Sequence, residues 1–493
     1  MDELLEIIYD NYYSISNTLC FVTDKEYIRF VYELRNLNKE KFDSKKYLKN
    51  YKDSIGKKLI DNIESGNNDS FFSEKEFLHF VYPYEQTLRR FQILYITIGE
   101  EDWKQIFGFS YKIFINFICF IIQRIVLYND YKVTKDKKRK KEYEEAFPLS
   151  TNYFLTKEEL YSYFPKEHDA IDKILELFSI EINNIKYIKD TYRFLKNKDK
   201  YVLYFMWDFI YNSYDLIEDI IVDYYKNRKK EDNFYQKRGN EFEKYCYQKL
   251  IEAFPKANIY RKLYYDYNKG NHEIDIILET QNEIIVFECK SSKFDIHTTK
   301  NDEELKKEFL RAFGNSYKTI NDFDDYINDN NKVLYSKSNK KKYSFDFKEK
   351  NIFYINITLH NIEYLQTSVQ KIDKSLIIPV GIYPINWNFI DFLTIIELAK
   401  MNPKPIIEYI YKRFKMLNDN KEITFDVDEI DVLGFLTDEQ NERVYKMLIE
   451  NSNNIDTNFI ISNGIYREQI NSLFNRKMFN SFFAKESKEV RHE

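Results

Sequence analysis

The chain has 493 residues, 43% hydrophobic and 31% charged, a composition typical of globular, soluble proteins and not of disordered ones. At roughly 150 residues a domain, a chain of this length is expected to form about three domains. The formal net charge of −5 excludes nucleic-acid binding through overall charge, so any such site must be a local basic patch. The ten glycines lie too far apart for a dinucleotide-binding GxGxxG motif or a P-loop.

The cysteines and the apolar segments indicate the compartment. The four cysteines form no CxxC pair, which predicts a reduced, intracellular chain without a structural zinc site. The most apolar stretch, 113–122, is about ten residues long, whereas a membrane-spanning helix needs about 20. The N-terminus is acidic and unlike a signal peptide. We therefore expect a cytoplasmic protein with no membrane segment.

Residues 1–230 are predicted to form a mostly helical domain. Apolar residues recur three and four positions apart, and the segment 201–225 has a broad apolar face without glycine or proline. No motif assigns this region a role. We expect it to bind a protein partner, a second copy of the chain or a DNA duplex.

The pattern changes after the basic cluster 226–230. A helix is predicted at 236–253, followed by three short alternating apolar runs separated by turn residues, which is typical of a β-meander; the runs are 259–265, 273–278 and 284–289. Next come a polar helix at 302–327 and a lysine-rich loop at 337–342. The expected elements from there on are strands at 352–359 and 376–383, then helices from 387 that are broken at Pro403 and Pro405.

Charged residues meet at the ends of two of these strands. Alternate side chains of a strand share a face, so Glu288 and Lys290 should point the same way, with Asp275 within reach on the neighbouring strand. Two carboxylates and a lysine suit Mg²⁺, which prefers oxygen ligands and keeps several waters. The alternative is a solvent-facing charge pattern, against which stands the buried run of Ile284 to Phe287 that leads into the charged residues.

The helix adds a third carboxylate. At 100° per residue, Glu243 shares a face with Cys246 and Leu250, while Glu241 falls with Tyr245 on the side predicted to face water. A carboxylate on the apolar face costs free energy unless it meets a cation. Glu243 is therefore predicted to belong to the site and Glu241 to the surface.

These residues resemble the PD-(D/E)XK nuclease superfamily over roughly 235–383. The family pattern is Gly-x-x-Phe-Glu on a helix, an Asp on the second core strand and Glu-x-Lys on the third; here it is matched by 239–243, Asp275 and 288–290. The proline of the family motif is replaced by Ile274. The resemblance implies an α/β (α+β) restriction-endonuclease-like nuclease core at 231–385, flanked by mainly α-helical N- and C-terminal regions at 1–230 and 386–493.

The resemblance also implies a role for each residue. Asp275, Glu288 and the backbone carbonyl of Cys289 would bind Mg²⁺ or Mn²⁺, and Glu243 would complete or support the metal shell. Lys290 would position the attacking water and counter charge on the phosphorus. The family members are metal-dependent nucleases, so the implied activity is endonucleolytic hydrolysis of phosphodiester bonds, in DNA before RNA.

Lysine clusters are expected to hold the nucleic-acid backbone, because phosphate neutralisation supplies much of the affinity for DNA. The candidates lie in two loops, at Lys229 and Lys230 and at Lys340, Lys341 and Lys342. Nucleases joined to helical domains resemble anti-phage defence or restriction-type effectors, which is the cellular role that we expect. An RNA-directed nuclease, and an inactive nuclease fold that serves as a binding or scaffold module, remain alternatives.

Overall fold

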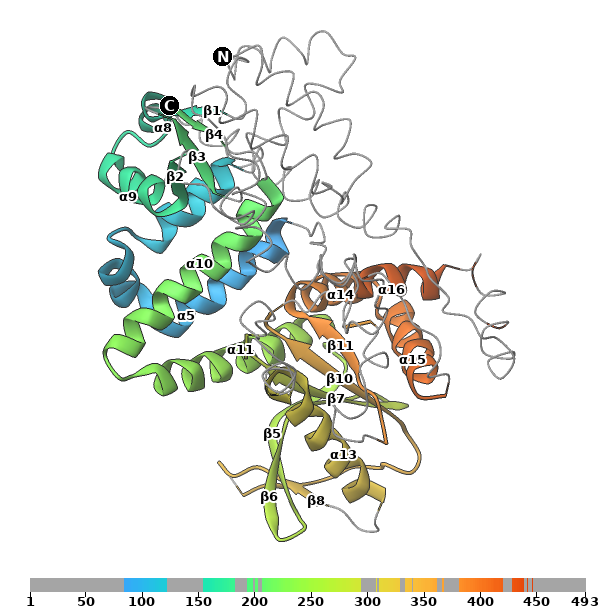
Figure 1. Cartoon of the computed structure of the whole chain (residues 1–493). Helices are drawn as coiled ribbons and strands as arrows, with labels where there is room; N and C mark the ends of the chain where they lie inside the picture. The colour runs from blue at the N-terminus through green and yellow to red at the C-terminus, as the bar shows by residue number, and fades with distance from the viewer. Residues whose placement is uncertain are drawn as a thin grey trace, which may run out of the picture. The chain divides into compact units, whose positions relative to one another are not determined.

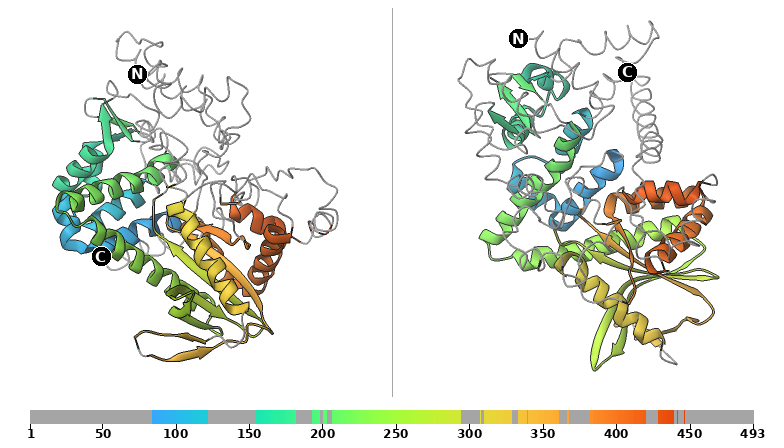
Figure 2. Two further views of the ribbon diagram at one scale, coloured as in Figure 1. Left: turned by 60° about the horizontal axis from the view of Figure 1, so that its bottom comes forward. Right: turned by 45° about the vertical axis from the view of Figure 1, so that its right-hand side comes forward.

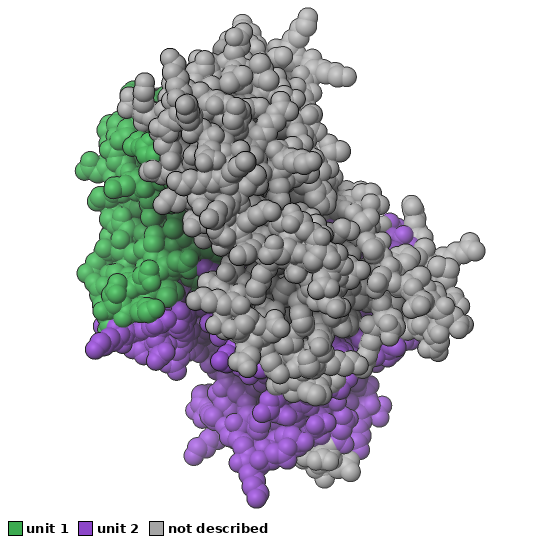
Figure 3. All heavy atoms as spheres, in the orientation of Figure 1, with its two compact units in different colours: residues 1–74, 78–81, 98–228 green, residues 75–77, 82–97, 229–493 purple. Residues whose placement is uncertain are grey.

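The computed structural model describes residues 84–121, 154–181, 193–197, 200–202, 206–293, 307, 310–328, 333–338, 340–360, 366–367, 381–419, 428–438, 441 and 446. These residues divide into two compact units (Figure 3). The first unit contains the described residues within 98–228, and the second contains those within 82–97 and 229–493. The predicted domain limits at 230 and 385 stay a prediction.

The first unit is built on helices and a small sheet. Its helices are part of α5 (Tyr84–Phe107), a helix at Tyr111–Ile121, α8 (Lys157–Tyr163), α9 (His168–Phe178) and α10 (Met206–Asn227). Its strands follow the order β1-β4-β3-β2, with β1 at Phe154–Thr156, β2 at Ser179–Glu181, β3 at Phe194–Asn197 and β4 at Lys200–Val202. This sheet was not predicted, because strands of three or four residues are too short to show alternation.

After the first part of α5, the second unit continues from residue 229 with the predicted helix and meander. They are α11 (Glu231–Ala253), β5 (Asn258–Tyr267), β6 (Gly270–Glu279) and β7 (Glu283–Lys290) (Figure 1). The sheet has seven strands in the order β11-β10-β7-β6-β5-β8-β9, completed by β8 (Val333–Tyr335), β9 (Lys342–Ser344), β10 (Asn351–Thr358) and β11 (Ile385–Asn388). Because β10 pairs in parallel with both β7 and β11 while the other pairs are antiparallel, the sheet is mixed.

The described part of the last predicted strand, 376–383, does not form a strand. Residues 381–383 are not part of a strand, and β11 begins only at Ile385. The reason is that the backbone of Tyr383 bonds to a side chain: its N–H donates to Asn418 Oδ1 at 2.8 Å, and its carbonyl accepts from Asn418 Nδ2 at 3.1 Å. Residues 376–380 of the predicted strand lie outside the described residues.

Helices cover both faces of the sheet (Figures 1 and 2). Val286 of β7 packs in a core cluster with Ile320 and Phe323 of α13 (Asn315–Asn328). Cys289, three residues further along β7, faces Cys246 of α11. Residues three apart on a strand point to opposite faces, so α13 and α11 pack on opposite sides of β7.

The predicted C-terminal helices are present among the described residues. They are α14 (Phe389–Met401), α15 (Pro403–Asp419) and α16 (Glu429–Thr437), and Pro403 begins α15 as expected of a helix-breaking residue. They belong to the same compact unit as the sheet. Of the predicted helix at 302–327, the described part consists of a π-helical turn, Leu310–Gly314, followed by α13.

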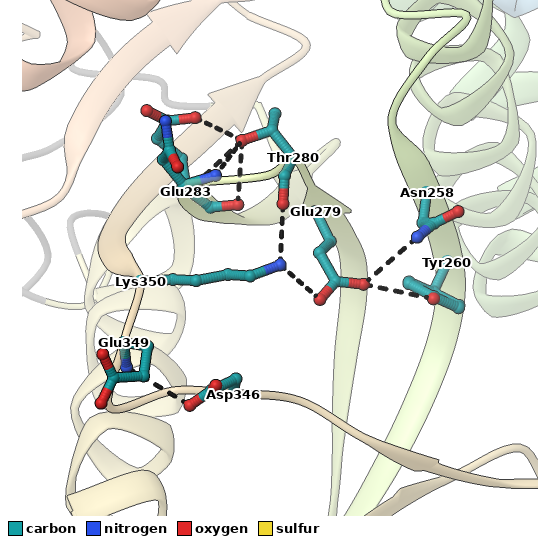
Figure 4. A network of polar contacts seen from close by, with 9 residues as sticks. Asn258, Tyr260, Glu279, Thr280, Glu283, Asp346, Glu349 and Lys350 are labelled. Carbon is teal, nitrogen blue, oxygen red and sulfur yellow. Dashed lines mark hydrogen bonds and ion pairs between the residues drawn. The ribbon is translucent and has the colours of Figure 1, made fainter.

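A polar network fixes the turn between β6 and β7 (Figure 4). Thr280 Oγ1 accepts the Glu283 N–H at 2.9 Å, and Lys350 Nζ donates to Glu279 Oε1 at 2.8 Å and to the Thr280 carbonyl at 2.7 Å. Since the geometry of a turn sets the register of its hairpin, these bonds help to align Ile276 with Phe287. The next residues beyond that pair are Asp275 and Glu288.

One observation bears on membranes. Among the described residues, no single helix is long and apolar enough to span a bilayer. Only when they are taken together are the segments Gln86–Phe107 and Tyr111–Ile121 long and apolar enough to span a bilayer, and this pair is bent by 82°.

Candidate functional site

The predicted strand residues meet where the β6–β7 ladder ends. The last backbone pair is Ile276 with Phe287, and beyond it the Asp275 side chain takes the place of a ladder bond: Oδ2 accepts the Cys289 N–H at 2.7 Å. Lys290 Nζ donates to Glu288 Oε2 at 3.1 Å, so both side chains lie on one face as expected. The metal-ligand role of the Cys289 carbonyl stays a prediction.

The helix contributes Glu243, which is only 6% exposed. Its Oε1 accepts from Arg261 Nε at 2.6 Å and its Oε2 lies 3.4 Å from Lys262 Nζ. One carboxylate oxygen from each of Glu243, Glu273 and Asp275 lies within 4.8 Å of the others. We call these three residues the acid cluster.

The helical-face prediction is confirmed for both glutamates and wrong for Tyr245. The side chain of Glu241 is 27% exposed and pairs with Lys244 at 3.7 Å. Tyr245 was expected to face water but is 7% exposed, because its ring packs 5.6 Å from that of Phe389. Phe389 belongs to α14, a second helix that covers this face of α11 and that the pattern of α11 alone could not reveal.

Three residues of the site were not predicted. Glu273 could have been found, since it precedes Asp275 by two positions and strand alternation puts both on one face. Arg261 and Lys262 carry no signal of their own. Lys262 has a φ of 53° in the middle of β5, the left-handed region that non-glycine residues rarely adopt. Such strain is often found at functional sites, and here it lies beside the acid cluster.

The carboxylates raise each other's pKa. Burial and the neighbouring Asp275 raise the pKa of Glu243 to about 7 against the pull of Arg261 and Lys262. Burial and Asp275 raise the pKa of Glu288 to about 8 although Lys290 opposes them. Burial likewise raises the pKa of Asp275, against Lys290 and the Cys289 N–H. Burial disfavours the ammonium of Lys290, but Glu288 and Asp275 outweigh it and raise its pKa above the usual range.

The folded protein without metal should therefore lose stability as pH rises. A carboxyl group whose pKa is raised by folding contributes stability below its unfolded value, here near 4.5, and loses it through the folded values of about 7 and about 8. Thermal unfolding in EDTA from about pH 5 to about pH 9 should show that the stability of Glu288→Gln rises relative to that of the wild type as pH rises. The reason is that the variant has no ionisable group at position 288. Parallel profiles would contradict the assignment of this pH dependence to Glu288.

The site suits a hard divalent cation. Three carboxylates that can each offer an oxygen within 4.8 Å match the oxygen ligands of Mg²⁺. Glu288 lies beside this group and not in it, so the acid cluster joins Asp275 to Glu243 and Glu273 rather than to Glu288. Within the described structure Glu288 Oε1 is buried without a hydrogen-bond partner, and a buried carboxylate oxygen of this kind needs a proton, a water or a cation.

The predicted nucleic-acid-binding lysines lie apart from the acid cluster. Lys229 and Lys230 are exposed at the start of α11. Lys340, Lys341 and Lys342 are exposed on the hairpin of β8 and β9, at the edge of the sheet. Of the loop predicted at 337–342, the described residues up to Lys341 do lie between the two strands, and only Lys342 belongs to a strand.

Comparisons with known proteins match about a quarter of the chain to one domain family. Residues 238–360 match the model of a domain of unknown function, DUF4143. This span begins within α11 and ends just after β10, so it includes Glu243, Asp275, Glu288 and Lys290. No curated protein and no solved structure matches the chain.

Proposed function

We propose that this protein is a metal-dependent nuclease with a restriction-endonuclease-like core, which hydrolyses phosphodiester bonds in DNA as a defence or restriction-type effector. The observation that carries the proposal is the convergence of four polar side chains from three elements: Glu243 from α11, Asp275 from β6, and Glu288 and Lys290 from β7. Burial of these charges costs free energy and calls for a compensating ligand. The likeness of their order and spacing to the PD-(D/E)XK pattern supports DNA as the substrate.

Each side chain would have a separate task. Asp275, Glu243 and Glu273 would hold Mg²⁺ or Mn²⁺, with Glu288 beside them. A bound divalent cation would polarise the scissile phosphate and lower the pKa of a water molecule. Lys290, which the two carboxylates keep protonated, would orient the attacking water and stabilise negative charge on the phosphate oxygens.

The activity should depend strictly on a divalent cation. Purified protein should cleave DNA with Mg²⁺ or Mn²⁺ and should be inactive in EDTA, because the site offers carboxylates and no histidine cluster to promote hydrolysis. The measurement is incubation with plasmid, linear duplex, single-stranded DNA and RNA under each condition. Full activity in EDTA would overturn the catalytic assignment. Cleavage of RNA alone would overturn the assignment of DNA as the substrate. Binding without cleavage of any substrate would favour the inactive module.

A further inference from the structure

A row of side chains crosses the sheet from the acid cluster to the lysine-rich hairpin. In the β-ladders Glu273 pairs with Tyr264, Tyr264 pairs with Tyr335, and Tyr335 pairs with Lys342. Directly opposite residues of antiparallel strands share a face, so all four side chains lie on one face of β6, β5, β8 and β9. Neighbouring strands lie about 4.8 Å apart, which makes the row roughly 14 Å long. We call these four residues the stacking row.

The two tyrosines form a continuous aromatic surface. Their ring centroids are 6.2 Å apart with 33° between the ring planes, and both side chains are partly exposed. The hydroxyl of Tyr335 donates to Asp266 Oδ1 at 3.1 Å and also accepts from Asn271, which fixes the orientation of its ring. Tyr264 is the direct ladder partner of Glu273, which places the aromatic surface next to the acid cluster.

The hairpin end of the row is strongly basic. The segment 333–344 contains four lysines and no acidic residue, and all four are exposed; they are Lys337, Lys340, Lys341 and Lys342. Lys337 Nζ lies 3.8 Å from the centroid of the Tyr264 ring. An exposed cation–π contact of this kind is weaker than the stacking of a base on an aromatic ring. A base can therefore displace Lys337, whose long side chain is then free to meet a phosphate.

We propose that the stacking row binds the unpaired bases of single-stranded DNA and leads its backbone to the acid cluster. Aromatic rings beside a basic surface are the combination by which proteins hold single strands, because every base has a π-face and every nucleotide a phosphate. A duplex hides its base faces within its own stack and gains nothing from the tyrosines. This inference rests on the proposed function and specifies its substrate as single-stranded DNA.

The test measures binding by the full-length chain in EDTA, so that cleavage does not interfere. Tyr335→Leu should weaken binding of a single-stranded DNA oligonucleotide about tenfold, the loss expected for one stacked base. Tyr335→Phe keeps the ring and should bind within about twofold of the wild type. The matched control is Tyr411→Leu on α15, which removes a tyrosine that is 46% exposed away from the row and should leave binding unchanged. Thermal unfolding of each variant checks that it folds.

An oligonucleotide with abasic sites separates stacking from charge. The wild type should bind it no more tightly than Tyr335→Leu binds the intact strand, and Tyr335→Leu should cause no further loss, because no base remains to stack. Equal weakening of intact, abasic and duplex DNA by Tyr335→Leu would overturn the inference, and so would tighter binding of an RNA strand of the same sequence. If the variants bind as expected but the protein shows no Mg²⁺-dependent cleavage, only the proposed nuclease activity is contradicted. If the protein cleaves DNA but the variants do not bind as expected, only this inference is contradicted.

Discussion

Lys290→Ala should lower DNA cleavage by a hundredfold or more while Mg²⁺ binding survives. The ammonium donates to Glu288 and is not a metal ligand, so its loss removes stabilisation of the reacting phosphate and leaves the carboxylates in place. A hundredfold loss corresponds to about 2.7 kcal/mol, which is typical for removal of one such charged donor. Cleavage rates and calorimetric titration with Mg²⁺ on the same preparation measure the two effects separately.

The companion variant is Asp275→Asn, which should lose both metal binding and cleavage. Asp275 belongs to the acid cluster and also accepts the Cys289 N–H, so the isosteric amide preserves shape but offers no charge to a cation. Lys237→Ala is the matched control, an exposed lysine of α11 whose loss should change neither quantity. Lys290→Ala that abolishes metal binding, or that cleaves at the wild-type rate, would contradict the role given to this lysine.

Glu243→Gln should weaken cleavage by tenfold or more, whereas Glu241→Gln should leave it near the wild-type rate. A tenfold loss is about 1.4 kcal/mol of transition-state stabilisation. Glu243 is buried in the acid cluster, and Glu241 is a partly exposed side chain paired with Lys244. The two substitutions are chemically identical and two residues apart, so each controls for the other. Cleavage rates at saturating Mg²⁺ decide between them.

The ion pair of Glu243 with Arg261 sharpens this comparison. If Glu243 serves only to neutralise Arg261, Glu243→Gln should reduce thermal stability without lowering the cleavage rate of the folded enzyme. If Glu241→Gln lowers the cleavage rate and Glu243→Gln does not, the face of α11 that contains Glu241, and not the face that contains Glu243, would be the one that supports the reaction. Glu241→Gln should cost less than ~0.5 kcal/mol of stability, as surface substitutions usually do.

The sequence was sufficient to predict the part of the sheet that carries the site. The runs that became β5 and β6 are long enough to show alternation, the run of β7 is continuously apolar as in a buried strand, and the charges that follow Phe287 mark where that strand ends. The burial of Glu243 followed from the face that it shares with Cys246. These inferences needed only local periodicity, which is set by backbone geometry.

The parts that could not be predicted depend on partners distant in sequence. β11 was missed because its polar residues do not look buried, yet Asn386 is 1% exposed and donates to the Tyr317 hydroxyl of α13 at 2.8 Å. At 381–383, the described end of the strand predicted at 376–383, the prediction was wrong because Asn418, on α15, takes the backbone bonds of Tyr383. Arg261 belongs to the site only because α11 packs over β5. None of these contacts has a local signature.

The hairpin of β6 and β7 is fixed at one end and open at the other. At the turn, Thr280 and Lys350 hold it with several hydrogen bonds, while at the site end the backbone ladder stops at Ile276 and Phe287. The conformational entropy of the turn is therefore lost on folding and not again on binding. At the open end β10 still pairs with β7 as far as Lys290, and the Asp275 carboxylate still accepts the Cys289 N–H, so the backbone there is already ordered. A ligand that enters there has to order only a few side chains, which favours tight binding by a small site.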